Sequence, residues 1–288
     1  MIHRRPVIAL GFLLPAIALY AFITLYPTVR GAWLSFTDSL GGEPGPFVGL
    51  ANYEQILNDS QATAALKNTL VYAAFVVVCQ NLLGLIFAIW LMSLPRILGA
   101  IRVALLAPAM MAPVLAGFIW SYIYAPGGSL DAVLSSLGMG KQTWLAEPSH
   151  ALYAVAAVHV WMFTGYSCAI FLASYLAIPQ DLKDAALLDG ASAWQRFRCV
   201  DWPLLAPATT ITVTLSVIGT LRTFDLPLVM TNGGPVNSTE TLSLLIYQKV
   251  FQESDFAYGT ALAVVLLLVV IILSSATSTL LQRRERHL

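Results

Sequence analysis

The sequence has few charged residues for its length. Of its 288 residues only 10% are charged, whereas 58% are hydrophobic. Soluble domains carry about 25% charged residues. The 15 Lys and Arg residues balance the 15 Asp and Glu residues, so the formal net charge is zero. The composition therefore favours a membrane protein, and it gives no support for a nucleic-acid partner or a strongly charged substrate.

Cysteine is scarce, and the common catalytic motifs are missing. Cys79, Cys168 and Cys199 have no metal-ligand spacing and suggest no disulfide framework. The sequence contains no GxxxxGK[ST] phosphate loop, no GxGxxG after a strand, no HExxH and no GxSxG. A transporter built on this chain must therefore draw its energy from another source. His159 stands alone in an apolar segment, and we expect it to pack or line a cavity and not to relay protons.

Six apolar segments are long enough to cross a bilayer, which requires about 20 mostly apolar residues. They lie at about 6–28, 68–93, 101–124, 151–177, 204–229 and 258–281. The sequence predicts an all-α membrane protein in which residues 1–288 form one domain of six transmembrane helices. Arg4 and Arg5 before the first segment also fit a signal peptide. That segment exceeds a typical h-region and lacks a clear small-x-small cleavage site, so we expect a retained anchor helix.

The distribution of basic residues predicts the orientation, because cytoplasmic loops are enriched in Lys and Arg. With both termini in the cytoplasm, ten basic residues fall inside: Arg4, Arg5, Arg96, Arg102, Lys183, Arg196, Arg198, Arg283, Arg284 and Arg286. Four fall outside: Arg30, Lys67, Lys141 and Lys249. Arg222 lies within a span and is not counted. We therefore expect a multi-pass protein with cytoplasmic termini.

The polar segment 181–203, called the hairpin below, lies between two of the most apolar segments. Residues 181–189 have helical spacing, and Gly190 can adopt the left-handed conformation that ends a helix. Ser192 is a candidate cap for a second short helix, which Pro203 closes. Trp194, Phe197 and Val200 form a narrow apolar stripe along that helix. The sequence thus predicts two short helices joined at a glycine, on the cytoplasmic side.

Two interpretations of the hairpin remain. An apolar stripe with acidic flanks suits a groove on another protein. Alternatively, the segment lies against the inner leaflet as a surface helix. The second interpretation favours a lysine-rich polar face, whereas the hairpin carries Asp181, Asp184, Asp189 and Asp201. The acidic character favours docking on a protein.

The hairpin resembles the "EAA" signature of permease subunits in binding-protein-dependent ABC importers. The residues that match are Asp184-Ala185-Ala186, Gly190, and Val200-Asp201-Trp202-Pro203. Asp184 replaces the usual glutamate, and Trp202 stands where leucine is usual. "NYEQILND" with "NTL" at 68–70, and "FDLPLVMTNGGP" at 224–235, are similar to the carbohydrate branch, in the first-subunit position of its permease pair. The resemblance covers about residues 10–280.

The resemblance implies a permease with a coupling helix in the bacterial cytoplasmic membrane. The implied partners are a homologous second permease, two ATP-binding subunits, an extracytoplasmic solute-binding protein and membrane lipid, with no nucleic acid. ATP and Mg would be held by the ATP-binding subunits, with no cofactor or metal on this chain, which would have no catalytic residue. The implied ATPase-coupling residues are Asp184, Ala185, Ala186, Asp189, Gly190, Ala191, Trp194, Phe197 and Pro203.

Charged residues inside the fifth apolar segment are candidates for the solute path. A charge near the bilayer centre costs about 2.5–3.5 kcal/mol, so such residues are usually paired and face protein or water. We predict that Arg222 and Asp225, three residues apart, form an ion pair lining the path. They then contact sugar hydroxyls with Thr220 and Thr223, or they form a structural clasp, with Asp225 capping a helix that breaks before Pro227.

Other polar and aromatic residues in the spans are weaker candidates. Gln80 and Asn81 join neighbouring helices or contact solute. Trp161, Thr164 and Tyr166 pack between helices or contact a sugar through aromatic faces and hydroxyls. Trp120, Tyr122 and Tyr124 read mainly as an interfacial aromatic belt.

Two other classes of function compete with an importer subunit. A secondary transporter would need a titratable relay, or repeated halves with broken helices near the midplane, and the sequence suggests one break and no clear repeat. A membrane-embedded enzyme would need a cluster of nucleophile, base or metal ligands, whereas single residues are scattered here. The sequence therefore favours an ATP-driven carbohydrate importer and leaves the solute open.

Overall fold

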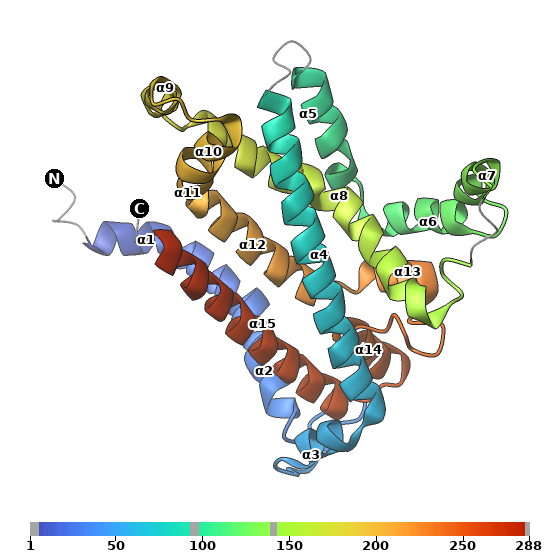
Figure 1. Cartoon of the computed structure of the whole chain (residues 1–288). Helices are drawn as coiled ribbons and strands as arrows, with labels where there is room; N and C mark the ends of the chain where they lie inside the picture. The colour runs from blue at the N-terminus through green and yellow to red at the C-terminus, as the bar shows by residue number, and fades with distance from the viewer. Residues whose placement is uncertain (1–5, 93–97, 139–142, 286–288) are drawn as a thin grey trace. The chain divides into compact units, whose positions relative to one another are not determined.

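The computed structural model describes residues 6–92, 98–138 and 143–285 (Figure 1). The described residues fold into helices and connecting loops, and the only β-bridges among them are two isolated ones, Thr37–Phe47 and Leu40–Asp255. Five basic residues used for the orientation argument lie outside the described residues: Arg4, Arg5, Arg96, Lys141 and Arg286.

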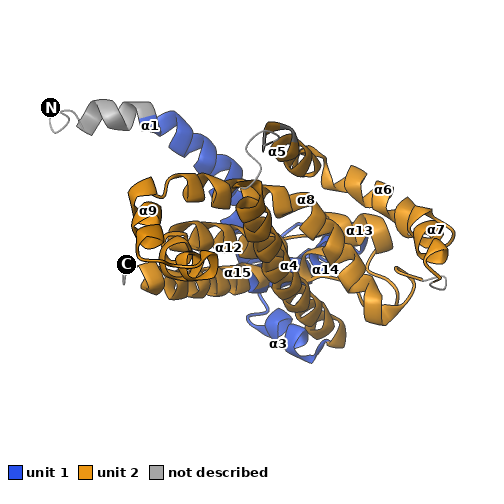
Figure 2. Cartoon of the chain, turned by 45° about the horizontal axis from the view of Figure 1, so that its top comes forward, with its two compact units in different colours: residues 1–59, 245–265 blue, residues 60–244, 266–288 orange. Residues whose placement is uncertain are grey.

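The chain divides into two compact units (Figure 2). Unit 1 contains residues 1–59 and 245–265, and unit 2 contains residues 60–244 and 266–288. The long helix α15, Phe256–Glu285, contributes its first part to unit 1 and the rest to unit 2. Helix α14, Leu242–Tyr247, likewise begins in unit 2 and ends in unit 1.

Unit 1 is built from the first apolar segment and the loop that follows it. Its elements are α1 Pro6–Tyr20, the π-helical turn η1 Ala21–Leu25, α2 Tyr26–Leu34, α3 Ala51–Asn58 and the π-helical turn η4 Gln248–Gln252. The loop after α2 is fixed by Asn52, whose buried amide donates to the carbonyls of Ser35 at 2.9 Å and Thr37 at 3.0 Å. Tyr258 of α15 donates its hydroxyl to Asp59.

Helices α4, Ser60–Met92, and α8, Pro148–Leu176, form the centre of unit 2. Both are predominantly apolar and longer than a bilayer span requires. They approach closely because Gly84 has no side chain, and a Cβ atom there would lie 2.6 Å from Cβ of Ser167. Buried side chains such as Tyr72, Val76, Val155 and Met162 fill the space around the pair.

The third apolar segment is bent. Helix α5, Leu98–Leu106, passes into the 3₁₀ turn η2, Ala107–Met110, and α6 begins afresh at Pro113 and ends at Tyr124. The stretch Ile101–Met110 meets the longer stretch Pro113–Ser136 at 103°. Pro108 and Pro113 account for the bend, because proline lacks the amide hydrogen that a continuous helix uses. Helix α7, Ser129–Ser136, follows in the next loop.

The fifth apolar segment is also interrupted. Helix α12 runs from Ala206 to Leu221, and α13 runs from Asp225 to Thr231. Residues 222–224 between them are not helical. The loop after α13 is fixed to the start of α4, because Asn68 donates to the carbonyl of Asn237 at 2.9 Å and Leu242 N–H donates to Thr69 Oγ1 at 2.8 Å.

The described helices include four that are long and apolar enough to cross a membrane, or up to six if each bent pair forms one span. The four are Leu13–Leu34, Ser60–Met92, Pro148–Leu176 and Phe256–Glu285. The two bent pairs are Ile101–Met110 with Pro113–Ser136, and Ala193–Leu204 with Ala206–Leu221. The six-span architecture predicted from the sequence falls within this range.

Candidate functional site: a coupling hairpin and a polar cavity

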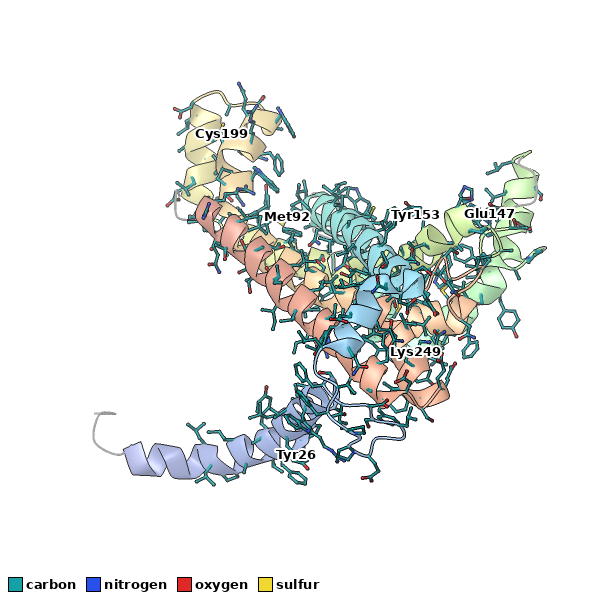
Figure 3. All side chains as sticks on the ribbon, turned by 90° about the horizontal axis from the view of Figure 1, so that it is seen from below. Tyr26, Met92, Glu147, Tyr153, Cys199 and Lys249 are labelled. Atoms are coloured by element: carbon teal, nitrogen blue, oxygen red, sulfur yellow. The ribbon has the colours of Figure 1, made fainter. Side chains whose placement is uncertain are left out.

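The hairpin forms two short helical arms, as the sequence predicts. The first is α9, Gln180–Leu188, and the second consists of α10 Ala193–Arg196, the π-helical turn η3 Phe197–Asp201 and α11 Trp202–Leu204. Gly190 joins them with a φ of +76°, the left-handed conformation that glycine adopts without steric cost. Ser192 caps α10 through a capping box with Gln195. Figure 3 labels Cys199 on the second arm.

Buried polar contacts fix the base of the hairpin. Tyr175, near the end of α8, donates its hydroxyl to Asp201 Oδ2 at 3.0 Å. The Lys183 ammonium donates to the Tyr175 carbonyl at 3.4 Å. The same ammonium lies 4.3 Å from the centre of the Tyr175 ring. Arg284 of α15 donates to the Trp202 carbonyl at 2.7 Å and stacks on its ring. Both arms are therefore tied to long helices of unit 2.

The predicted coupling residues divide between the surface and the base of the hairpin. Trp194 is 68% exposed, and its ring stacks on that of Phe197 at a centroid distance of 5.6 Å. Asp184 is exposed and accepts a hydrogen bond from Gln180 at 3.0 Å, and Asp189 ends the first arm. The remaining members take the following places: Ala185 exposed, and Ala186, Ala191 and Pro203 half-buried. The tip presents further apolar surface at Leu188, which is 89% exposed.

A cavity of about 330 Å³ lies between α4, α8 and α12, and we call it the polar cavity. Its lining contains eight polar or charged side chains: Gln80, His159, Tyr166, Thr212, Ser216, Arg222, Thr223 and Asp225. Four apolar side chains, proline included, and one glycine complete it: Pro113, Leu215, Leu226, Phe163 and Gly219. Five of the predicted solute-path residues therefore meet at one place.

Gln80 lines the polar cavity and carries an unused hydrogen-bond acceptor. It is 4% exposed, and its amide nitrogen donates to Ser167 Oγ at 2.9 Å. Its carbonyl oxygen, Oε1, is buried and has no hydrogen-bond partner among the described residues. A buried acceptor without a donor costs about 1–3 kcal/mol, so Oε1 would gain from any rearrangement that brings a hydroxyl or water to it. Asn81 donates to Ser216 Oγ at 2.8 Å and so joins α4 to α12, and its own carbonyl oxygen, Oδ1, is likewise buried without a partner among the described residues.

The predicted ion pair between Arg222 and Asp225 is not formed. The two ion pairs among the described residues are Arg196–Asp201 and Lys249–Glu253. The prediction assumed a continuous helix, in which residues three apart are neighbours. Because α12 ends at Leu221 and α13 starts at Asp225, the two charges lie on either side of a break. Asp225 makes no capping hydrogen bond at the start of α13 either, so the structure does not form the proposed clasp.

Trp161, Thr164 and Tyr166 do not form one set. Tyr166 lines the polar cavity, whereas Trp161 and Thr164 line a separate apolar cavity of about 510 Å³ with Phe75 and Phe87. The helix geometry gives the reason, because successive residues turn by about 100°, which puts Thr164 and Tyr166 about 200° apart. The Thr164 hydroxyl donates to the Val160 carbonyl at 2.6 Å. Trp161 and Thr164 therefore lie away from the polar cavity.

His159 lines the polar cavity, in agreement with the expectation of a packed or cavity-lining residue. It is 7% exposed, and its Nδ1 lies 3.0 Å from the hydroxyl of Tyr72.

The aromatic residues Trp120, Tyr122 and Tyr124 occupy different environments. Tyr122 is 78% exposed, whereas Tyr124 is buried and donates to the Ala154 carbonyl at 3.3 Å. Trp120 packs edge-on against Trp161.

Sequence reasoning missed Thr212, Ser216 and Gly219, which line the polar cavity along one face of α12. Their separation by four and three residues places them on one side of a helix. That spacing was the available signal. Thr220, which was a candidate, is 1% exposed and donates to the Ser216 carbonyl at 2.7 Å, so it does not reach the cavity.

Comparisons with known proteins show which protein family this chain matches. The family profile described as "Binding-protein-dependent transport system inner membrane component" matches residues 80–287. A probable ABC transporter permease of Pyrococcus horikoshii is 34% identical, with 88% of each chain covered. The trehalose/maltose transport system permease of Thermococcus litoralis is 32% identical, covering 89% of this chain and 88% of its own.

A starch-degradation-product permease of Thermoanaerobacterium thermosulfurigenes is 30% identical over 95% of this chain and 94% of its own. Among solved structures, a chain of a bacterial ABC transporter that imports alginate superposes with a TM-score of 0.85 at 19% identity, covering 97% of this chain and 96% of that one. At this identity the likeness concerns the fold alone. The predicted fold class, an all-α ABC importer permease fold, is confirmed.

Proposed function

Because the chain belongs to the family of binding-protein-dependent transport system inner membrane components, we propose that it is a permease subunit of an ABC importer for a sugar or sugar-like solute. The names of the relatives from Thermococcus litoralis and Thermoanaerobacterium thermosulfurigenes support a carbohydrate. The chain is a transport subunit and not an enzyme. ATP and Mg are held by two separate ATP-binding subunits.

The hairpin is where an ATP-binding subunit docks. The observation that supports this role is the contrast between its two ends. Trp194 and Leu188 expose apolar surface at the tip, whereas the base is fixed by the buried Tyr175–Asp201 hydrogen bond. An exposed aromatic anchor on a short helix suits a groove on a partner. A fixed base transmits movement of the tip to α8 and α12, because it has little freedom to move separately.

The polar cavity is the part of the solute path that this chain supplies. Sugar hydroxyls both donate and accept hydrogen bonds, and the lining offers groups of both kinds. Gln80 Oε1 is a buried acceptor without a protein donor, and Arg222 offers donors from the non-helical segment. The break between α12 and α13 supports this placement, because irregular backbone at membrane depth is tolerated where it lines a cavity. Tyr166 supplies an aromatic face.

The chain is an integral membrane protein that works with an extracytoplasmic solute-binding protein. We place it in the bacterial cytoplasmic membrane with both termini inside, next to a homologous second permease. The ends of α4 and α8 and the start of α5 lie at the same end of unit 2 as the hairpin (Figure 1). Lys183, Arg196, Arg198 and Arg102 belong to this end, which supports a cytoplasmic hairpin.

Uptake by proteoliposomes tests the proposal. The complete transporter, containing this chain, the second permease, two ATP-binding subunits and the solute-binding protein, is reconstituted with ATP inside. We expect uptake of a labelled sugar that requires ATP and continues when an uncoupler collapses the proton gradient. Loss of uptake on uncoupling at constant ATP would instead support an ion-coupled secondary transporter.

A further inference from the structure

A third cavity of unit 2, called the groove below, is distinct from the polar cavity. It has a volume of about 280 Å³ and lies between α4, α5 and α8. One face of α8 forms its floor, with the residues Gly165, Cys168, Ala169, Leu172, Ala173 and Leu176. From Gly165 to Leu176 this floor is about 16 Å long at 1.5 Å per residue. One leaflet contributes about half of the roughly 30 Å hydrocarbon core, so the groove matches the depth of a single leaflet.

Arg102 is the one charged side chain among the described residues that line this groove. Its Nε atom is buried and has no hydrogen-bond partner among the described residues. Every Asp and Glu of the sequence lies within the described residues, and none of them forms an ion pair with Arg102. The groove therefore holds a cation without an acidic side chain to neutralise it.

An anion from outside the chain fits this arrangement. Burying a polar group without a hydrogen-bond partner is unfavourable, and a charge in the membrane normally has a partner or reaches the interface. Leu176, the last residue of α8, and Leu91, next to the end of α4, both line the groove. The groove thus reaches the end of unit 2 that carries the hairpin, where lipid headgroups lie. Figure 3 labels Met92 at this end of α4.

We propose that this groove binds one anionic phospholipid, with its phosphate at Arg102 and an acyl chain on the apolar face of α8. Basic pockets between transmembrane helices on the cytoplasmic side are suited to anionic headgroups. A second permease subunit is the other possible occupant. The lipid is favoured because a protein partner would have to supply a buried carboxylate, whereas every phospholipid headgroup carries a phosphate.

Lipid titration followed by native mass spectrometry tests the site on the full chain purified in detergent. We expect phosphatidylglycerol to bind the wild type, and to bind Arg102→Gln about tenfold or more weakly, because a charge-assisted hydrogen bond is lost. Arg198→Gln removes an exposed arginine of the hairpin and serves as the matched control, with unchanged binding. Ala173→Phe keeps Arg102 but fills the groove, and it should also weaken binding. Equal binding by wild type and Arg102→Gln overturns the proposal.

Two further experiments identify the occupant of the groove. Inorganic phosphate at millimolar concentration should not displace phosphatidylglycerol, and displacement would mean a site for free anions without a role for the acyl groove. A photo-crosslinking amino acid at Leu176, in membranes of cells making the complete transporter, should capture lipid. Capture of the second permease subunit in place of lipid would overturn the proposal.

Discussion

Tyr175 of α8 donates its hydroxyl to Asp201 of the hairpin at 3.0 Å, and both side chains are buried. Asp201 also lies 3.9 Å from the Arg196 guanidinium. The hydrogen bond between Tyr175 and Asp201 joins the base of the hairpin to α8, a helix that lines the polar cavity. It is therefore a direct physical link between the proposed docking site and the solute path.

Tyr175→Phe should loosen this link. The variant keeps the ring against Lys183 but leaves the Asp201 carboxylate without its neutral donor, at a cost of about 1.5–3 kcal/mol in the free energy of unfolding. We expect a lower thermal midpoint in detergent and less solute moved per ATP hydrolysed. Tyr153→Phe is the control, because Tyr153 contacts Phe75 through its ring alone. Equal effects of the two variants would show that the hydroxyl of Tyr175 has no special role.

Gly190→Val should separate membrane insertion from assembly with the ATP-binding subunits. No atom lies within 4 Å of a Cβ built at Gly190, so the expected effect comes from its φ of +76° alone. A left-handed conformation costs an ordinary residue roughly 1–2 kcal/mol, and more if it is β-branched.

Co-purification of the ATP-binding subunits measures the outcome. We expect Gly190→Val to insert normally and to lose the subunits, whereas Gly190→Asn, which tolerates this conformation, should retain most of them. Full co-purification and transport by Gly190→Val would count against the hairpin as a docking site.

Gly165→Ala should disrupt unit 2. A Cβ atom at this position would lie 1.9 Å from the Leu105 carbonyl oxygen, and a backbone atom cannot move aside as a side-chain end can. We expect a loss of about 1–3 kcal/mol or more in stability, read as a lower thermal midpoint. Gly219→Ala, with no atom within 4 Å of its Cβ, should change the midpoint little. A normal midpoint for Gly165→Ala would mean that α5 and α8 do not cross there.

Exchanging the charges of Arg222 and Asp225 should not restore transport. Both residues line the polar cavity without pairing, so each acts on solute through its own position. We expect Arg222→Asp, Asp225→Arg and the double variant to raise the KM for uptake, with the double variant no better than the more impaired single one. Recovery in the double variant would show that the two side chains pair during transport.

The sequence allowed much of the hairpin to be predicted, because its structure depends on local chemistry. Gly190 and Ser192 act within a few residues of themselves, and both occupy the predicted conformations. Contacts such as Tyr175 with Asp201 lie 26 residues apart and follow from tertiary packing.

The polar cavity was predicted less well, because its lining depends on tertiary packing and not on local chemistry. The break at residues 222–224 decides which charges can meet, and the α8 face decides that Tyr166 and Thr164 line different cavities. In the sequence of the fifth apolar segment, Pro227 is the single sign of this break. The groove at Arg102 depends on how α4, α5 and α8 pack, which no local pattern specifies.

Accessibility of the hairpin in the assembled transporter tests the central claim most directly. A Leu188→Cys variant, in a background with Cys79→Ser, Cys168→Ala and Cys199→Ser, is treated with a water-soluble maleimide. We predict rapid labelling of the chain alone, since Leu188 is 89% exposed, and strong protection in a transport-competent particle that contains the ATP-binding subunits. Equally rapid labelling of that particle would contradict the account, because the tip of the hairpin would then be uncovered while transport proceeds.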